Sequence, residues 1–524
     1  MISGKNYIGF STSAEGAKTI QSIAAASGKK LQGDFYTATV DEINKAVEKA
    51  QNAFKIYAKV SGVKKALFLD TIADEIEAIG DPLIQRAVLE SGLPEGRFQG
   101  ERGRTTGQLR LFATLLREGS WVEATIDTAL PNRTPIPRPD LRKIFTAVGP
   151  VAVFGASNFP LAFSTAGGDT ASALASGCPV IVKAHESHLG VNDLVAGAIS
   201  RAAEKTGMPD GVFSSLNASD HEVGKALVLH EGVKSVAFTG SYAGGTALYQ
   251  LAQTRKEPIP VFAEMGSVNP VILLEDKLKV DTNKLAELYA GSITLGVGQF
   301  CTNPGLLLAV KSDALNNFSN ELTSKLDGIA AGTMLNSGIA SAYTESRTFA
   351  LAQKDVELRT KADSTHGTPT LAVTSGATFL HNTSLHLEIF GPYSLLVECE
   401  SKEELTAIIN VLEGQLTGTL MGTEEDFNKN PTLIDALHNK VGRLIFNAAP
   451  TGVEVSSAMV HGGPFPAATD SRFTSVGTGA IKRFVRPICY QGMPESLLPE
   501  ELRNNNPLNI SRIVNGETTK SAIG

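Results

Sequence analysis

One cysteine of the chain lies in a setting that suits a nucleophile. Cys301 occurs in the segment GVGQFCTNPG, with Gly296, Gly298 and Gly305 close to it. These glycines let the backbone fold tightly around the thiol and expose main-chain N–H groups. Such donors lower the pKa of a thiol and bind an oxyanion. Cys301 is therefore a candidate nucleophile, and a buried structural cysteine is the alternative that the residue alone leaves open.

Two other polar side chains follow apolar segments with the length of strands. Glu264 ends the segment IPVFAE, and Asn158 follows VAVFGAS. A partly desolvated carboxylate at a strand end can serve as a general base, and an amide N–H can donate to an oxyanion. Taken alone, Glu264 also fits a salt bridge and Asn158 a turn.

Apolar segments alternate with helical periodicity through most of the chain. Strands are predicted at 151–157, 179–183, 233–240, 259–264, 269–274, 305–310, 416–422 and 441–447. Helices are predicted at 40–58, 63–79, 81–91, 106–116, 193–205, 242–253, 281–296 and 402–413. This alternation is typical of parallel α/β sheets. Ligands bind at the carboxyl ends of such strands, so Asn158, Lys183, Gly240 and Glu264 are expected to meet at one edge.

The composition narrows the class of protein. The 524 residues include 47 basic and 54 acidic side chains, a net charge of −7, which indicates no surface for nucleic acid. No apolar segment approaches the length of a membrane span, and no secretory signal is visible, so a cytoplasmic location is expected. Cys178, Cys399 and Cys489 lack metal-ligand spacing and are interpreted as structural, so neither a metal site nor a disulfide framework is expected.

Six segments, in this order, resemble the aldehyde dehydrogenase superfamily: FGASNFP, PVIVKAHES, VAFTGS, EMGSVNP, GQFCTNPG and EIFGP. The resemblance extends from about residue 20 to 495. It implies that Cys301 attacks the aldehyde, that Asn158 and the Cys301 N–H hold the oxyanion, and that Glu264 activates the water that hydrolyses a thioester. A thiohemiacetal gives up hydride more readily than a free hydrated aldehyde.

The resemblance also implies a dinucleotide site and an architecture. Its cofactor-binding residues are Lys183, Glu186, Gly240, Ser241, Glu388 and Phe390. Glu186 disfavours a 2′-phosphate, whereas Lys183, His185 and His188 can accommodate one, so NAD and NADP both stay open.

A Rossmann-like cofactor domain and an α/β catalytic domain with a small β extension are expected. The expected bounds are 1–119 and 143–267 for the cofactor domain, 268–478 for the catalytic domain, 120–142 and 479–496 for the extension, and 497–524 for a C-terminal tail, in which 504–506 and the last ten residues are expected to be loosely ordered. The extension implies a homodimer or homotetramer.

The substrate is the least determined feature. Ser157 replaces the tryptophan usual before the Asn, and the loop PFPAATDSRFTSVG departs from the common glycine-rich form. The segment SNFPLAFSTAGGDTASALASGCPVIVKAH most resembles the corresponding segment of bacterial α-ketoglutaric semialdehyde dehydrogenases, and NADP-dependent fatty-aldehyde enzymes share some of its character. The substrate-contact candidates are Phe159 and Phe465, with Arg104, Arg110 and Arg472 as possible anchors for a substrate carboxylate.

Three other functions compete with this hypothesis. A cysteine hydrolase needs a histidine partner for Cys301, for which His461 in MVHGG is the nearest candidate. A non-catalytic relative is disfavoured because Cys301, Glu264 and Asn158 are all present. An acylating dehydrogenase is disfavoured because Glu264, the deacylating base, is retained.

Overall fold

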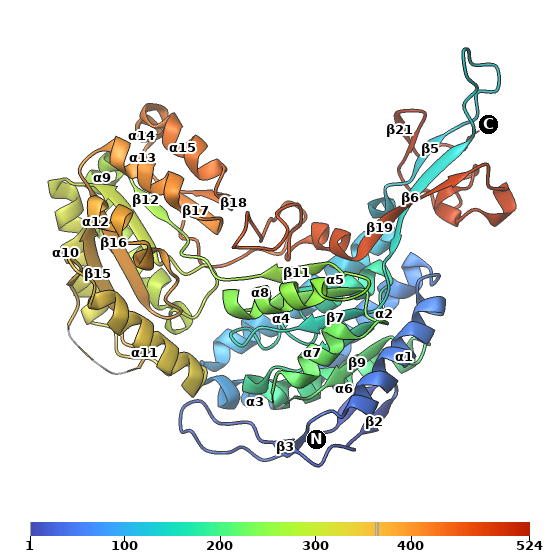
Figure 1. The fold of residues 1–524 in the computed structure, drawn as a ribbon, viewed down its shortest axis with the longest axis horizontal. Coiled ribbons are helices and arrows are strands. Elements are labelled where there is room, and N and C mark those ends of the chain that lie inside the picture. Colours follow the sequence, from blue (N-terminus) through green and yellow to red (C-terminus); the bar gives the residue numbers. More distant parts are fainter. Residues whose placement is uncertain (1, 219, 362, 364–365, 524) are drawn as a thin grey trace.

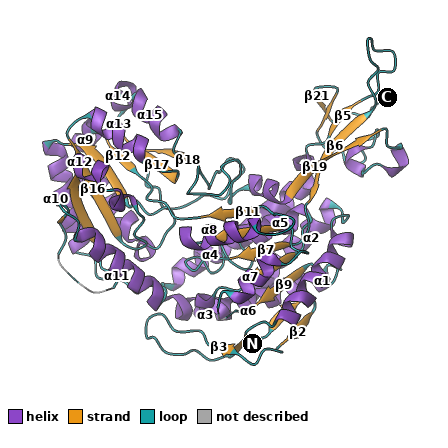
Figure 2. Cartoon of the chain, viewed as in Figure 1, coloured by secondary structure: helices purple, strands orange, loops and turns teal. Residues whose placement is uncertain are grey.

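The computed structural model describes residues 2–218, 220–361, 363 and 366–523. Two lobes, each built around a seven-stranded sheet, lie side by side, and a five-stranded arm projects from one of them (Figure 1). Helices cover the two large sheets, whereas the arm is mostly strand and loop (Figure 2). Within the described residues, none of the helices combines the length and apolar character that a membrane span requires.

The first lobe contains a sheet with the order β11-β10-β7-β8-β9-β1-β2, in which β7 to β11 run parallel. The chain proceeds from β7 to β9 in one direction and then crosses to β10, so the strand order reverses between β7 and β10. Ligands of open α/β sheets bind outside the carboxyl ends of the strands at such a point. Its strands are β1 (Asn6–Ile8), β2 (Ser11–Ser13), β7 (Val151–Phe154), β8 (Val180–Lys183), β9 (Phe213–Leu216), β10 (Ser235–Thr239) and β11 (Val261–Glu264), and a separate ribbon is formed by β3 (Thr19–Ile20) and β4 (Phe35–Tyr36).

Alternation along the strands explains how helices pack on both faces of this sheet. In β7, Val151 and Val153 belong to the apolar core beneath α2 to α6, and Ala152 and Phe154 to the core beneath α1, α7 and α8. The expected helix at 40–58 is confirmed, and a capping box of Thr39 and Glu42 marks its start. The helices of this lobe are α1 (Val40–Tyr57), α2 (Gly62–Ile79), α3 (Asp81–Ser91), α4 (Glu95–Glu118), α5 (Gly168–Ser176), α6 (Leu189–Lys205), α7 (Glu222–Leu229) and α8 (Tyr242–Gln253).

The second lobe contains a sheet with the order β14-β15-β16-β13-β12-β17-β18, parallel except for β14. Four of these strands are those predicted between 269 and 447, while β14, β15 and β16 were not predicted. The strands are β12 (Val271–Leu273), β13 (Leu306–Val310), β14 (Glu357–Leu358), β15 (Thr370–Ser375), β16 (Tyr393–Cys399), β17 (Gln415–Met421) and β18 (Val441–Phe446). The helices are α9 (Glu275–Thr294), α10 (Asp313–Asp327), α11 (Ser337–Leu351), α12 (Gly376–His381), α13 (Lys402–Val411), α14 (Glu424–Lys429) and α15 (Pro431–His438).

The arm has the strand order β19-β6-β5-β20-β21. The tail supplies β20 and β21 and buries Leu498, Leu502 and Ile510 against the arm. The expectation of loose order at 504–506 and in the last ten residues was wrong for the described part, because Asn506 is buried and β21 lies within the last ten residues. The Asn506 amide holds this segment by donating to the carbonyls of Ile510 and Lys520. The arm strands are β5 (Thr125–Asp127), β6 (Leu141–Ala147), β19 (Val485–Gln491), β20 (Arg512–Val514) and β21 (Glu517–Thr519).

Candidate active site

Cys301 lies in a tightly folded loop between α9 and β13. Gly298 has φ +65°, and a Cβ there would come within 2.3 Å of the Gly391 carbonyl carbon, so only glycine fits this approach. The Asn269 side-chain amide donates to the carbonyl oxygens of Cys301 and Asn303, each at 2.9 Å. The Asn269 amide therefore holds the backbone of the loop at two points, at Cys301 itself and two residues after it.

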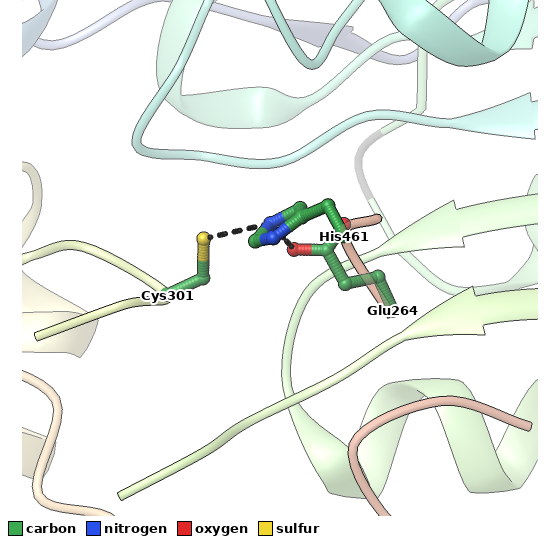
Figure 3. Close-up of side chains that lie close together, drawn as sticks. All are labelled: Glu264, Cys301 and His461. Carbon is green, nitrogen blue, oxygen red and sulfur yellow. Dashed lines mark hydrogen bonds and ion pairs between the residues drawn. The ribbon is translucent and has the colours of Figure 1, made fainter. Parts of the chain in front are cut away.

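A histidine and a carboxylate stand beside the thiol (Figure 3). His461 Nε2 lies 3.4 Å from Cys301 Sγ and 2.7 Å from Glu264 Oε1. The second contact has ion-pair distance but not the alignment of a hydrogen bond. The Ser475 hydroxyl donates to the other Glu264 oxygen at 2.5 Å. Glu264, Cys301 and His461 come from three segments that lie far apart in the sequence.

The imidazole of His461 lies between the thiol and the carboxylate. Its Nε2 approaches both Cys301 Sγ and Glu264 Oε1, and a hydrogen on this nitrogen suits the carboxylate oxygen 2.7 Å away. In that tautomer Nε2 has no lone pair with which to accept the proton of the thiol. Glu264 is the remaining proton acceptor within this group.

The pKa values of the pair follow from burial and from these contacts. Burial raises the pKa of the Cys301 thiol well above its usual value, Glu264 raises it further, and Arg104 opposes the rise. The expected depression of this pKa is therefore not found. Burial also raises the pKa of Glu264, but His461 and Ser475 outweigh it and leave that pKa below its usual value. The resting site thus holds a protonated thiol beside an ionised carboxylate.

Asn158 lies close to the thiol loop, directly after β7. Its Nδ2 donates to the carbonyl of Gln299 at 2.9 Å, two residues before Cys301, and the side chain is buried. One amide hydrogen remains for another acceptor. The Asn158 amide is therefore anchored to the loop that carries Cys301.

The dinucleotide candidates of the first lobe lie after β8 and β10. Ser241 caps α8 through its side chain, and Gly240 precedes it, so exposed N–H groups of a twelve-residue helix face outward at the carboxyl edge of the sheet. Burial lowers the pKa of Lys183, opposed by the exposed Glu186. This edge has the form that binds a diphosphate.

The two histidines considered for a 2′-phosphate have other contacts in the structure. His188 Nε2 contacts the Ala156 carbonyl at 2.9 Å, and His185 Nδ1 accepts from the Ser187 N–H. Burial lowers the pKa of both rings, most strongly that of His185. They stay uncharged at neutral pH and add little attraction for a phosphate.

The second lobe contributes Glu388 and Phe390, which line a small cavity together with Ser267 and Gly298. Gly266 leaves room for this carboxylate, because a Cβ there would lie 2.2 Å from Glu388 Oε2. Burial raises the pKa of Glu388 to about 7, opposed by a backbone hydrogen bond from Ser267. The side chain forms no ion pair among the described residues.

A larger cavity of about 490 Å³ opens onto the thiol. Its wall is largely apolar and aromatic, and it carries two arginines, Arg104 from α4 and Arg443 from β18. The other lining residues are Phe159, Phe163, Phe300, Cys301, Thr302, Thr451, Gly452, Val453, Glu454 and Met459. Phe159 and Arg104 therefore line the cavity that opens onto the thiol.

The other substrate-contact predictions were wrong in position. Arg110 pairs with Asp74 and Glu77 on the surface of α4. Arg472 pairs with Asp470, and its side chain is 79% exposed. Phe465 is exposed and packs on the ring of Tyr242 at the start of α8 rather than in the cavity. Each of the three was predicted because it lies near a site segment in the sequence. None of the three side chains lines the cavity.

Four residues at the site had no role in the aldehyde dehydrogenase hypothesis drawn from the sequence: Ser475, Asn269, Arg443 and His461. His461 had been considered only as the partner of a hydrolase cysteine. The glycines that follow it, in MVHGG, were the one local signal of a tight loop. The thiol, imidazole and carboxylate atoms lie within 4.8 Å of one another.

Comparisons with known proteins identify the family. The model of the aldehyde dehydrogenase family matches residues 11–464. The chain is 48% identical over 522 residues to α-ketoglutaric semialdehyde dehydrogenase 2 of Azospirillum brasilense, covering 98% of this chain and 99% of that one. It is 46% identical to α-ketoglutaric semialdehyde dehydrogenase of Acinetobacter baylyi, covering 99% of each.

Solved structures share the fold at lower identity. The aldehyde dehydrogenase KauB from Pseudomonas aeruginosa aligns with a TM-score of 0.79 and 22% identity, covering 94% of this chain and 97% of that one. Betaine aldehyde dehydrogenase from Staphylococcus aureus, in complex with NAD+, aligns with a TM-score of 0.79 and 19% identity, covering 94% and 96%. The expected fold class is confirmed, and the chain belongs to the aldehyde dehydrogenase family.

Proposed function

We propose that this aldehyde dehydrogenase oxidises α-ketoglutaric semialdehyde to 2-oxoglutarate, with NAD or NADP as the oxidant, through a thioester on Cys301. The observation that carries the proposal is the cavity in which the Cys301 thiol, beside Glu264 and His461, shares one wall with two arginines. The names of the Azospirillum and Acinetobacter relatives support the same substrate.

The proposed chemistry begins with removal of the thiol proton. Glu264 accepts it, and the His461 Nε2–H stabilises the thiolate that results. The thiolate attacks the aldehyde carbon, and the Asn158 amide donates to the oxyanion of the thiohemiacetal.

The residues that would hold the dinucleotide are Lys183, Glu186, Gly240, Ser241, Glu388 and Phe390. When bound, the cofactor supplies the acceptor for the hydride of the thiohemiacetal. After Glu264 has released the thiol proton to solvent, it removes a proton from the water that attacks the thioester, and the carboxylic acid leaves as the Cys301 thiolate is freed. Ser475 and His461 hold Glu264 in place between these two uses.

A fatty aldehyde is the second candidate substrate, because Phe159, Phe163, Phe300 and Met459 give the cavity an apolar wall. A cysteine hydrolase is disfavoured, because the nitrogen of His461 that faces the thiol must also carry a hydrogen toward Glu264. An acylating dehydrogenase and a non-catalytic relative are disfavoured by the retained Glu264 and Cys301.

We further propose a cytoplasmic homodimer or homotetramer, with the arm as the contact. In the described residues β19 pairs only with β6, so its other edge is free to pair with a second subunit. We retain the cofactor domain, catalytic domain and extension as its divisions, with β6 continuing to Ala147 and the tail joined to the extension.

The experiment is steady-state reduction of NAD and of NADP with α-ketoglutaric semialdehyde, succinic semialdehyde, glutaraldehyde and a long-chain aldehyde. Wild type is compared with Cys301→Ala. Turnover that is fastest with the keto-acid aldehyde and lost in the variant supports the proposal. Fastest turnover of the long-chain aldehyde discards the substrate, and no reduction of either cofactor discards the reaction.

A further inference from the structure

The two arginines of the large cavity differ from the other candidate arginines in having no acidic partner. Arg104 Nη2 donates to the Val453 carbonyl at 3.2 Å, and its guanidinium lies 4.9 Å from the centre of the Phe163 ring. Arg443 donates to the carbonyls of Gly452 at 3.1 Å and Pro450 at 2.8 Å. Neither forms an ion pair among the described residues.

Both guanidinium groups also hold buried N–H donors without a partner in the described residues, at Nη1 of Arg104 and Nε of Arg443. Burial lowers the pKa of both groups, and for Arg104 the nearby Glu101 carboxylate is the main group that opposes this. A partly buried cation with unused donors is costly unless an anion pairs with it. The cavity that opens onto the nucleophile therefore offers two guanidinium groups without a paired anion among the described residues.

The only acid in the lining of this cavity, Glu454, does not supply that anion. Its side chain is exposed, and it forms no ion pair with either arginine. Arg97, the nearby arginine over the Phe159 ring, is by contrast paired with the buried Glu101. The free positive charge is thus confined to Arg104 and Arg443.

We propose that Arg104 and Arg443 together bind the distal carboxylate of the substrate, and that this pair makes the enzyme select aldehydes with a carboxylate at the far end. The inference rests on the proposed function and names the residues that determine its specificity. A planar guanidinium matches a carboxylate with two parallel hydrogen bonds. One arginine comes from each lobe, so the substrate would bridge the lobes with its aldehyde at Cys301.

The same pair would exclude an uncharged chain. An alkyl tail in this cavity would cover the guanidinium groups without supplying an acceptor, leaving two buried cations unpaired. The apolar wall formed by Phe159, Phe163 and Phe300 then serves the short carbon chain between the two ends of the substrate.

The test uses Arg443→Gln, Arg104→Gln and the conservative Arg443→Lys, with Arg472→Gln as the matched control on an exposed arginine outside the cavity. Each enzyme is assayed with α-ketoglutaric semialdehyde and with pentanal, which has the same number of carbons and no carboxylate. Inhibition by 2-oxoglutarate provides a readout of carboxylate binding that does not depend on the chemical step.

The Gln variants should lose about 10- to 100-fold in kcat/KM for the keto-acid aldehyde, mostly through KM, and weaken inhibition by 2-oxoglutarate to a similar degree. The value for pentanal should stay the same or rise, since each Gln variant removes a cation that pentanal leaves unpaired. Arg443→Lys should recover part of the loss, and Arg472→Gln should match wild type.

Two results overturn the inference, and they differ from failure of the proposed function. If wild type prefers the keto-acid aldehyde and both Gln variants keep that preference, other residues bind the carboxylate and the proposed function stands. If the Gln variants lose activity equally toward both aldehydes, the arginines act on the fold of the cavity and not on the carboxylate. If wild type itself oxidises both aldehydes equally well, the proposed substrate fails together with the inference.

Discussion

Replacing His461 should change the pH dependence of the reaction, because its ring contacts both Glu264 and Cys301. The ring lies 2.7 Å from a carboxylate oxygen of Glu264 and 3.4 Å from the Cys301 sulfur. His461→Phe keeps a ring in the buried space but removes the N–H, and His461→Gln keeps a donor. The first variant should impair both uses of Glu264, and the second should restore part of the loss.

The magnitude follows from these contacts. Because burial alone raises the pKa of Glu264, losing the histidine should raise that pKa. Losing a hydrogen bond to a charged group costs about 1.5–3 kcal/mol, or on the order of 10- to 100-fold in rate. The ionised fraction of Glu264 falls first at low pH, so the defect should be largest there and shrink as pH rises.

The assay is the pH profile of kcat between about pH 5 and pH 9 for wild type, both variants and His438→Phe, an exposed histidine that serves as the control. Thermal unfolding and cofactor binding of each variant would be measured beside it. The reasoning fails if the acid limb of His461→Phe coincides with that of wild type while kcat stays within about twofold.

Three further predictions concern charge and packing elsewhere in the chain. The Glu388 carboxyl, with its pKa raised to about 7, should ionise as pH rises through 7, so cofactor affinity by fluorescence titration should improve from pH 6 to pH 8, and Glu388→Gln should abolish that change. Arg483→Gln leaves the buried Asp169 without its ion-pair partner, and burial already raises the pKa of that carboxyl. The variant should lower the free energy of unfolding in urea by about 3–5 kcal/mol. An unchanged unfolding midpoint would show that the ion pair contributes little to stability. Leu502→Ala, in the buried tail, should cost about 2–5 kcal/mol by the same assay, and Leu508→Ala, which is 40% exposed, should cost much less; equal effects would refute the packing assignment.

How much the sequence could predict depends on how local each signal was. The motif segments FGASNFP and GQFCTNPG carried Asn158 and Cys301 directly, because each side chain lies next to the turn that presents it. Periodicity predicted α1 and four strands of the first sheet, β7, β8, β10 and β11, for the same reason. The strands β1, β2, β9 and β14 to β16 were not predicted.

The contacts that complete the site were out of reach, since they join segments that only the fold brings together. His461 and Ser475 approach Glu264 across roughly two hundred residues, and nothing in MVHGG or FTSVG indicates that they do. From the sequence, Arg104, Arg110 and Arg472 were equally good candidates to bind a substrate carboxylate. The structure shows that Arg110 and Arg472 form ion pairs on the surface.

The most direct test of the central claim is to trap the intermediate on Cys301. Wild-type enzyme is mixed with cofactor and α-ketoglutaric semialdehyde, quenched in acid within milliseconds, digested, and analysed by mass spectrometry. We predict an adduct on the Cys301 peptide with the mass of the aldehyde less two hydrogens, present only when cofactor is included and absent from Cys301→Ala. Full turnover by Cys301→Ala, with no adduct on wild type at any quench time, would contradict the account.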